Sequence, residues 1–161
     1  MEQILLKKEH PNCILPHKSI STSVGYDCYV SRRELKDGAI WYYLGFSAQL
    51  PQGHFAMLPS RSSIVKTDLV QANGVGIIDA DYQGEWAFVT KLMPRVTEDF
   101  SGVILKTVFK LFYPEYFTVY NVGDKCCQFI VLQSPDTTIK EVTEFTNQTK
   151  RGTNGFGSTG K

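Results

Sequence analysis

The sequence predicts an all-β fold, a jelly roll or a distorted β-barrel, on two observations. Short runs rich in β-branched and aromatic residues recur along the chain, and Gly, Pro or Asn bounds each run. Only residues 62–69 favour a helical turn, which a serine would begin as its N-cap. Many short strands separated by turn residues are typical of sandwiches, jelly rolls and barrels.

The expected strands follow one another closely. They cover residues 40–50, 54–58, 77–78, 86–92, 117–120 and 126–132. Before them, residues 3–8 form a short, partly apolar run, and residues 21–30 alternate small, aromatic and polar side chains. We expect one barrel domain over residues 1–142. Residues 95–114 alternate apolar and polar side chains over 103–109, which predicts an inserted arm. Residues 143–161 are polar and rich in Gly, Ser and Thr, which predicts a flexible C-terminal arm.

Composition narrows the possible partners and the location. A net charge of +1 over 161 residues gives no strong field for nucleic acid or a membrane surface. No stretch approaches the ~20 apolar residues that span a bilayer. The four cysteines lack the spacing of a zinc site, so we expect reduced thiols in an intracellular, cytoplasmic protein. A nuclear location and a virus-infected cell stay open. On a regular strand the adjacent Cys126 and Cys127 would point to opposite faces.

Residues 72–85 form the stretch around which the chain is organised. Gly74 and Gly76 suit a tight hairpin turn whose backbone faces a ligand. Ile77 and Ile78 favour a strand, and Asp79 would end it, where a catalytic carboxylate is held firmly. Taken alone, the pattern fits a plain hairpin with turn aspartates equally well.

Two further stretches suit phosphate groups. The glycines of the tail let several backbone N–H groups converge on phosphate oxygens, and Arg151 adds a bidentate guanidinium. Phe156, between two glycines, would close over a flat base. Residues 59–63 offer a guanidinium, hydroxyls and the amides of a helix start, although such a motif is more often a surface turn.

Five stretches, in this order along the chain, resemble the five motifs of the trimeric dUTP pyrophosphatases (dUTPases). They are residues 23–29, 59–63, 73–85, 123–130 and 151–160. The resemblance spans nearly the whole chain. It implies a jelly roll that forms a homotrimer, in which the C-terminal arm of one subunit closes the active site of another. It also implies hydrolysis of dUTP to dUMP and pyrophosphate with Mg²⁺ as cofactor.

The resemblance further implies a role for each motif residue. Asp79 would activate the water that attacks the α-phosphorus, and Asp27 would act through water on Mg²⁺, which the triphosphate mainly holds. Tyr82 would lie under the deoxyribose and exclude a 2′-hydroxyl. The uracil ligands would be Asn73, the backbone of Gly76, Ile77 and Ile78, and Phe156 as a stacking ring. The phosphate ligands would be Arg61, Ser62, Ser63, Gln128, Arg151, Gly157 and Ser158.

Three positions depart from the family pattern. Ser63 replaces the commoner glycine of the second motif, and Lys125 replaces arginine in the fourth, so a bidentate contact becomes a point charge. Asn154 replaces glycine in the fifth motif, and asparagine tolerates positive φ. Residues 95–114 have no counterpart in compact members of the family and offer a possible surface for a protein partner.

Two alternatives stay open. A dCTP deaminase of the same fold needs a glutamate further along the strand after the third motif. Val89 and Thr90 occupy that place, and Glu85 comes too early. The other alternative is a nucleotide-gated regulatory or binding protein on the same scaffold, with residues 95–114 as its partner surface.

Overall fold

The computed structural model describes residues 2–93, 117–147 and 149–150. The expected inserted arm at 95–114 lies outside the described residues. So do Arg151, Phe156, Gly157 and Ser158 of the expected C-terminal arm. In the part of the chain that is described, no helix is long and apolar enough to cross a membrane.

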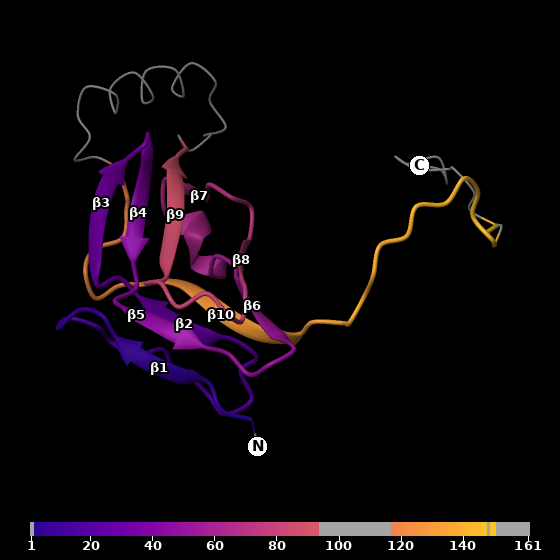
Figure 1. The fold of residues 1–161 in the computed structure, drawn as a ribbon. Helices are drawn as coiled ribbons and strands as arrows, with labels where there is room; N and C mark the ends of the chain where they lie inside the picture. The colour runs from indigo at the N-terminus through magenta and orange to yellow at the C-terminus, as the bar shows by residue number, and fades with distance from the viewer. Residues whose placement is uncertain (1, 94–116, 148, 151–161) are drawn as a thin grey trace, which may run out of the picture.

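The described residues form antiparallel sheets (Figure 1). In the smallest sheet, β1 (Leu5–Lys8) pairs with β5 (Phe46–Gln49). A four-stranded sheet has the order β2-β10-β6-β8, formed by Tyr26–Tyr29, Lys125–Gln133, His54–Leu58 and Gly76–Ile78. A second four-stranded sheet has the order β3-β4-β9-β7, formed by Arg32–Lys36, Ala39–Tyr43, Ala87–Leu92 and Leu69–Gln71.

The predicted all-β class is confirmed, with differences in detail. The run at 40–50 divides into β4 and β5, because Gly45 has a φ of 76° and breaks the strand. A Cβ at Gly45 would lie 2.6 Å from Ser31 Oγ, so only glycine fits there. The sequence did not predict strands β3 and β7. The strand predicted at residues 117–120 is not present in the structure. Strand β3 is mostly charged and exposed, so it carries no hydrophobic signal.

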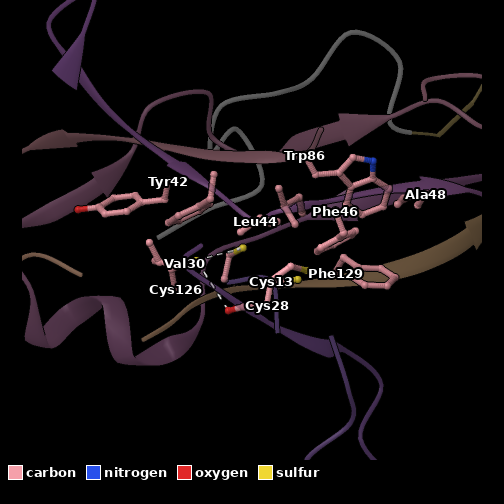
Figure 2. Packing of buried hydrophobic residues seen from close by; sticks show 14 of the residues in the cluster. Cys13, Cys28, Val30, Tyr42, Leu44, Phe46, Ala48, Trp86, Cys126 and Phe129 are labelled. Carbon is pink, nitrogen blue, oxygen red and sulfur yellow. Dashed lines mark hydrogen bonds between the residues drawn. The ribbon is translucent and has the colours of Figure 1, made fainter. Parts of the chain in front are cut away.

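Aromatic side chains from several strands fill the space between the sheets (Figure 2). Phe46, Trp86 and Phe129 are almost fully buried, with the Phe46 and Trp86 ring centroids 5.3 Å apart. Trp86 meets Phe129 edge-on at 5.2 Å. Burying one such side chain stabilises a fold by roughly 1.5–3 kcal/mol. This packing holds β5, β10 and the turn before β9 against one another, and so fixes the ends of these segments.

The four cysteines are buried free thiols, as expected. The expectation that Cys126 and Cys127 point to opposite faces is wrong. The pairing of β10 with β2 shifts register between Lys125 and Cys127, which marks a β-bulge. The bulge brings the two thiols to 3.7 Å from each other. Burial and the neighbouring thiols raise the pKa of Cys127, so its thiol stays neutral.

The predicted helical turn is a 3₁₀ helix, η1 (Ser62–Lys66). The expectation of a serine N-cap is wrong, because Arg61 holds that position and makes no side-chain capping bond. The turn ends at Thr67, whose hydroxyl donates to the Ile64 carbonyl at 2.7 Å. The Arg61 side chain is thereby free to reach the neighbouring strand β2.

Candidate active site

A surface cavity of about 370 Å³ lies where β2, β10 and the start of η1 meet. Its lining residues are Ser19, Ser23, Val24, Gly25, Asp27, Arg61, Ser62 and Gln128. Pairing of the strands explains this convergence. Gln128 lies opposite Asp27 in the β10–β2 ladder, and Ser60 bridges Cys127 on the other side of β10. The first, second and fourth motifs therefore share one cavity.

Asp27 is the electrostatic centre of this cavity. Its carboxylate accepts hydrogen bonds from Arg61 Nε at 2.9 Å, Lys125 Nζ at 2.9 Å and Ser19 Oγ at 2.6 Å. Burial by itself raises the pKa of Asp27, but these donors and the two cations outweigh it and hold the pKa below its ordinary value. The hydrogen bond to Asp27 raises the pKa of Lys125 in turn. Asp27 is therefore an anion that holds two cations at the cavity wall.

Gln128 reaches the cavity because Gly25 has no side chain. A Cβ at Gly25 would lie 2.7 Å from Gln128 Oε1, so any other residue at this position would displace the end of the Gln128 side chain. The Gln128 backbone N–H donates to the Pro59 carbonyl at 3.2 Å, which anchors β10 to the second motif. Arg61 also donates to Ser63 Oγ at 3.3 Å. The predicted phosphate ligands Arg61, Ser63 and Gln128 thus belong to one connected group with Ser62 in the cavity wall.

The stretch 72–85 departs from the expected hairpin. Its turn contains Gly74 at a φ of 68°, as predicted. However, β7 before the turn pairs with β9, whereas β8 after it pairs with β6 in the other sheet. The expected pairing of the two flanking strands is therefore wrong, since the turn links two sheets. Within the described residues β8 is the edge strand of its sheet, and edge strands have backbone groups free for a ligand.

Asp79 and Tyr82 lie in the exposed turn that follows β8. The Tyr82 backbone N–H donates to the Asp79 carbonyl at 3.2 Å, which closes the turn. The Tyr82 ring is half exposed and folds over Gly84, and its hydroxyl donates to the Glu85 carbonyl at 3.4 Å. The packing against Gly84 covers part of the Tyr82 ring, and about half of the side chain stays exposed to solvent. Asp79 lies at the end of a paired strand, as predicted.

The sequence of the chain matches the model of a known protein family. The dUTPase family model matches residues 12–100, more than half of the 161-residue chain. The chain belongs to the dUTPase family. A deoxyuridine 5′-triphosphate nucleotidohydrolase of Leptospira interrogans is 29% identical over 163 residues, covering 98% of this chain and 99% of its own.

Solved structures of dUTPases share the fold. A mutant dUTPase of Staphylococcus bacteriophage 80alpha, solved with dUpNHpp, superposes with a TM-score of 0.71 over 100% of both chains at 18% identity. A mutant dUTPase of S. aureus phage phi11, which coordinates a structural Mg(II) ion, superposes with a TM-score of 0.67 at 21% identity. It covers 90% of this chain and 99% of its own. These likenesses place the predicted jelly roll among dUTPase structures.

Asp27 is the acidic residue of the cavity that could contact a metal ion through water. Among residues 2–93, 117–147 and 149–150, no three His, Cys, Asp or Glu side chains are grouped to hold a metal ion. The Asp27 carboxylate already accepts three hydrogen bonds, from Ser19, Arg61 and Lys125. A carboxylate has about four acceptor positions, so one remains for a water. This donor set suits contact with Mg²⁺ through water.

The sequence predicts no role for Ser19 or Gln71 and only part of the role of Lys125. Ser19 precedes the first motif in a loop, and nothing in its surroundings predicts its bond to Asp27. Lys125 was predicted only as a weaker substitute for arginine, whereas it pairs with Asp27 in the structure. Gln71 ends β7 outside the five motifs and contacts two of them. These contacts join distant segments, which local sequence patterns do not encode.

Proposed function

We propose that the chain is a dUTP diphosphatase that hydrolyses dUTP to dUMP and pyrophosphate. Membership of the dUTPase family supports the proposal. The observation that carries it is the cavity at which Asp27, Arg61 and Gln128 meet. Strand β8, which carries the third motif, belongs to the same sheet through β6.

In the proposed reaction, Asp79 accepts a proton from a water as that water attacks the α-phosphorus of dUTP. A bond forms between the water oxygen and the α-phosphorus, the bond to the α–β bridging oxygen breaks, and pyrophosphate leaves. Arg61, Ser62, Ser63 and Gln128 bind the phosphates. Their charge and hydrogen bonds stabilise the negative charge that develops on the bridging oxygen.

Mg²⁺ is the proposed cofactor. When bound to the triphosphate, it neutralises negative charge on the phosphate oxygens. Asp27 would act on the ion through water, using the acceptor position that Ser19, Arg61 and Lys125 leave free. The same carboxylate holds Arg61 in place, so it organises the phosphate site even without the ion.

Asn73 and the backbone of Gly76, Ile77 and Ile78 are the proposed uracil ligands. Among the strands that the structure describes, β8 lies at an edge of its sheet, which supports this role because its outer backbone donors and acceptors could meet the Watson–Crick edge of a base. A Cβ at Gly76 would lie 3.3 Å from the Leu58 Cβ, so the strand packs closely on β6. Tyr82 would pack under the deoxyribose and exclude ribonucleotides.

We also propose a homotrimer in which the C-terminal arm of one subunit closes the site of another. Residues 135–147, which follow β10, are exposed and run away from the sheets (Figure 1). Ile139 and Phe145 on this segment are 103% and 90% exposed, and such apolar side chains are typical of a segment that packs on a second chain. Arg151, Phe156, Gly157 and Ser158 would complete the neighbouring site. Buried free thiols support an intracellular, cytoplasmic location.

The contacts of Glu85 favour hydrolysis over deamination. Its carboxylate accepts from Arg32 Nη2 at 2.7 Å and from the Gly45 backbone N–H at 3.1 Å. Both oxygens therefore hold strand ends together, which leaves Glu85 poorly placed as the acid and base of a deaminase. A regulatory role through residues 95–114 remains a separate prediction.

The test is a substrate panel. Purified protein with Mg²⁺ is incubated separately with dUTP, UTP, dTTP and dCTP, and both pyrophosphate and the nucleotide product are measured. We expect pyrophosphate and dUMP from dUTP and little product from the others. Conversion of dCTP to a uracil nucleotide, or equal hydrolysis of all four, would overturn the proposed function.

A further inference from the structure

The side chain of Gln71 connects three segments of the site. Its Oε1 accepts a hydrogen bond from the Ser60 backbone N–H at 2.9 Å, and its Nε2 donates to the Leu58 carbonyl at 2.8 Å. The same Nε2 donates to Asn73 Oδ1 at 3.3 Å. Gln71 lies at the end of β7, in a different sheet from β6 and β8. One side-chain amide thus joins the second motif to the turn that carries Asn73.

The backbone fixes the orientation of this amide. The Ser60 N–H is only a donor and the Leu58 carbonyl is only an acceptor, so Oε1 must face the first and Nε2 the second. A rotation by 180° would place two donors and two acceptors against each other. The second N–H of Nε2 faces Asn73, so the side-chain oxygen of Asn73 accepts this hydrogen bond.

Asn73 consequently has its N–H₂ group on the side away from Gln71. The Asn73 Nδ2 lies over Gly76, where a Cβ would meet it at 3.5 Å. Gly76 is the first residue of β8, whose outer edge is free within the described residues. The side chain of Asn73 therefore presents hydrogen-bond donors, and not its acceptor, toward Gly76 at the start of the strand proposed to read the base.

We propose that Gln71 is a positioning residue that sets base selectivity by holding the Asn73 amide with its donors toward the base. The inference rests on the proposed function, in which Asn73 contacts uracil. Uracil, like thymine, has a carbonyl acceptor at position 4, where cytosine has an amino donor. An amide that presents its N–H can donate a hydrogen bond to the carbonyl of uracil. With cytosine, the amide N–H and the amino group would be two donors facing each other. The selectivity for uracil then originates in two backbone groups, the carbonyl of Leu58 at the end of β6 and the N–H of Ser60 in the second motif.

The variant Gln71→Glu tests this most directly. It keeps the size of the side chain and the oxygen that accepts from Ser60, but replaces the donor by a carboxylate oxygen. Asn73 would rotate to donate to that oxygen and present its own acceptor to the base. We expect the ratio of kcat/KM for dUTP to that for dCTP to fall by about tenfold to a hundredfold, mainly through KM. The matched control is Gln52→Glu, an exposed glutamine in the turn after β5.

Two further variants separate this role from a structural one. Asn73→Asp leaves the contacts of Gln71 with Leu58 and Ser60 intact and presents acceptors on both sides. It should lower the same ratio even if Gln71→Glu fails to fold. In an Asn73→Ala background, Gln71→Glu should leave the ratio unchanged, because no amide remains to be oriented. A structural role of Gln71 would keep its effect in that background.

The outcomes distinguish the two proposals. A wild-type protein that does not hydrolyse dUTP would refute the proposed function. An active wild type, with an unchanged ratio in folded Gln71→Glu and in Asn73→Asp, would refute the role of Gln71 alone. A lowered ratio in both single variants that disappears in the Asn73→Ala background would establish it.

Discussion

Arg61 donates its Nε–H to the Asp27 carboxylate at 2.9 Å, and this ion pair joins motifs that lie 34 residues apart. The pair has a clear consequence for phosphate binding. Because Asp27 holds the guanidinium by one edge, the rest of the group is directed to Ser63 and the cavity. Asp27, which has no proposed contact with the α-phosphorus, can therefore control how the phosphates are bound through its hold on Arg61.

Asp27→Asn should lower the free energy of unfolding at pH 7 by about 1–3 kcal/mol, since hydrogen bonds to charged donors are lost. The lowered pKa of Asp27 gives the sign of the pH dependence. Its contribution is fully present above the ordinary pKa of about 4 and is lost as pH falls through the folded-state value. Urea unfolding at several pH values measures both effects.

The matched control for this experiment is Asp136→Asn, in the exposed segment after β10. It should keep the wild-type stability and acid dependence. The difference between wild type and Asp27→Asn should shrink as pH falls below about 4 and be smallest below the lowered folded-state pKa of Asp27, where the carboxyl group is protonated in both states. A constant difference down to strongly acid pH would contradict the assigned ion pair.

Gly25→Ala should raise KM for dUTP by about tenfold, because the new Cβ would displace the Gln128 side chain from the cavity. Steady-state kinetics give the value. The Gln128→Ala background is the control, since no side-chain amide remains there to be displaced. Equal losses from Gly25→Ala with and without Gln128 would show that the glycine serves the backbone instead.

Asp79→Asn should keep nucleotide binding and lower kcat by about a hundredfold to ten-thousandfold, the range of general-base catalysis. The amide retains the shape of the carboxylate but accepts no proton. Isothermal titration with the non-hydrolysed analogue dUpNHpp separates binding from turnover. Because Asp79 is exposed, the melting temperature should not change. A near-normal kcat would exclude Asp79 as the base.

Tyr82→Ala should allow hydrolysis of UTP, because the ring that would contact the sugar is removed. Tyr82→Phe is the control. It keeps the ring over Gly84 and removes only the hydroxyl that donates to the Glu85 carbonyl. We expect this variant to reject UTP as the wild type does. If both variants reject it equally, sugar selectivity resides elsewhere in the site.

Local patterns predicted the class of fold and most of the strands. Turn glycines and aromatic runs are local signals, so β6, β9 and β10 were located from sequence. The charged strand β3 carried no such signal, and sheet membership is a long-range property. For that reason the local pattern around Gly74 predicts a hairpin, although the two strands that flank the turn belong to different sheets.

The residues of the candidate site that belong to sequence motifs could be predicted, whereas the long-range contacts that hold them in place could not. Asp27, Arg61 and Gln128 were selected by resemblance, and the structure brings them to one cavity. The bonds from Ser19 and Gln71 depend on how loops from separate sheets meet. The bulge at Cys126 likewise follows from strand pairing, because one strand alone does not determine its register.

Hydrolysis of dUTP in oxygen-18-labelled water tests the central claim most directly, since it reports which phosphorus the water attacks. Mass spectrometry of the products locates the label. Attack at the α-phosphorus by the water that Asp79 activates predicts oxygen-18 in the phosphate of dUMP and none in pyrophosphate. Oxygen-18 in pyrophosphate, with unlabelled dUMP, would contradict this account of the site.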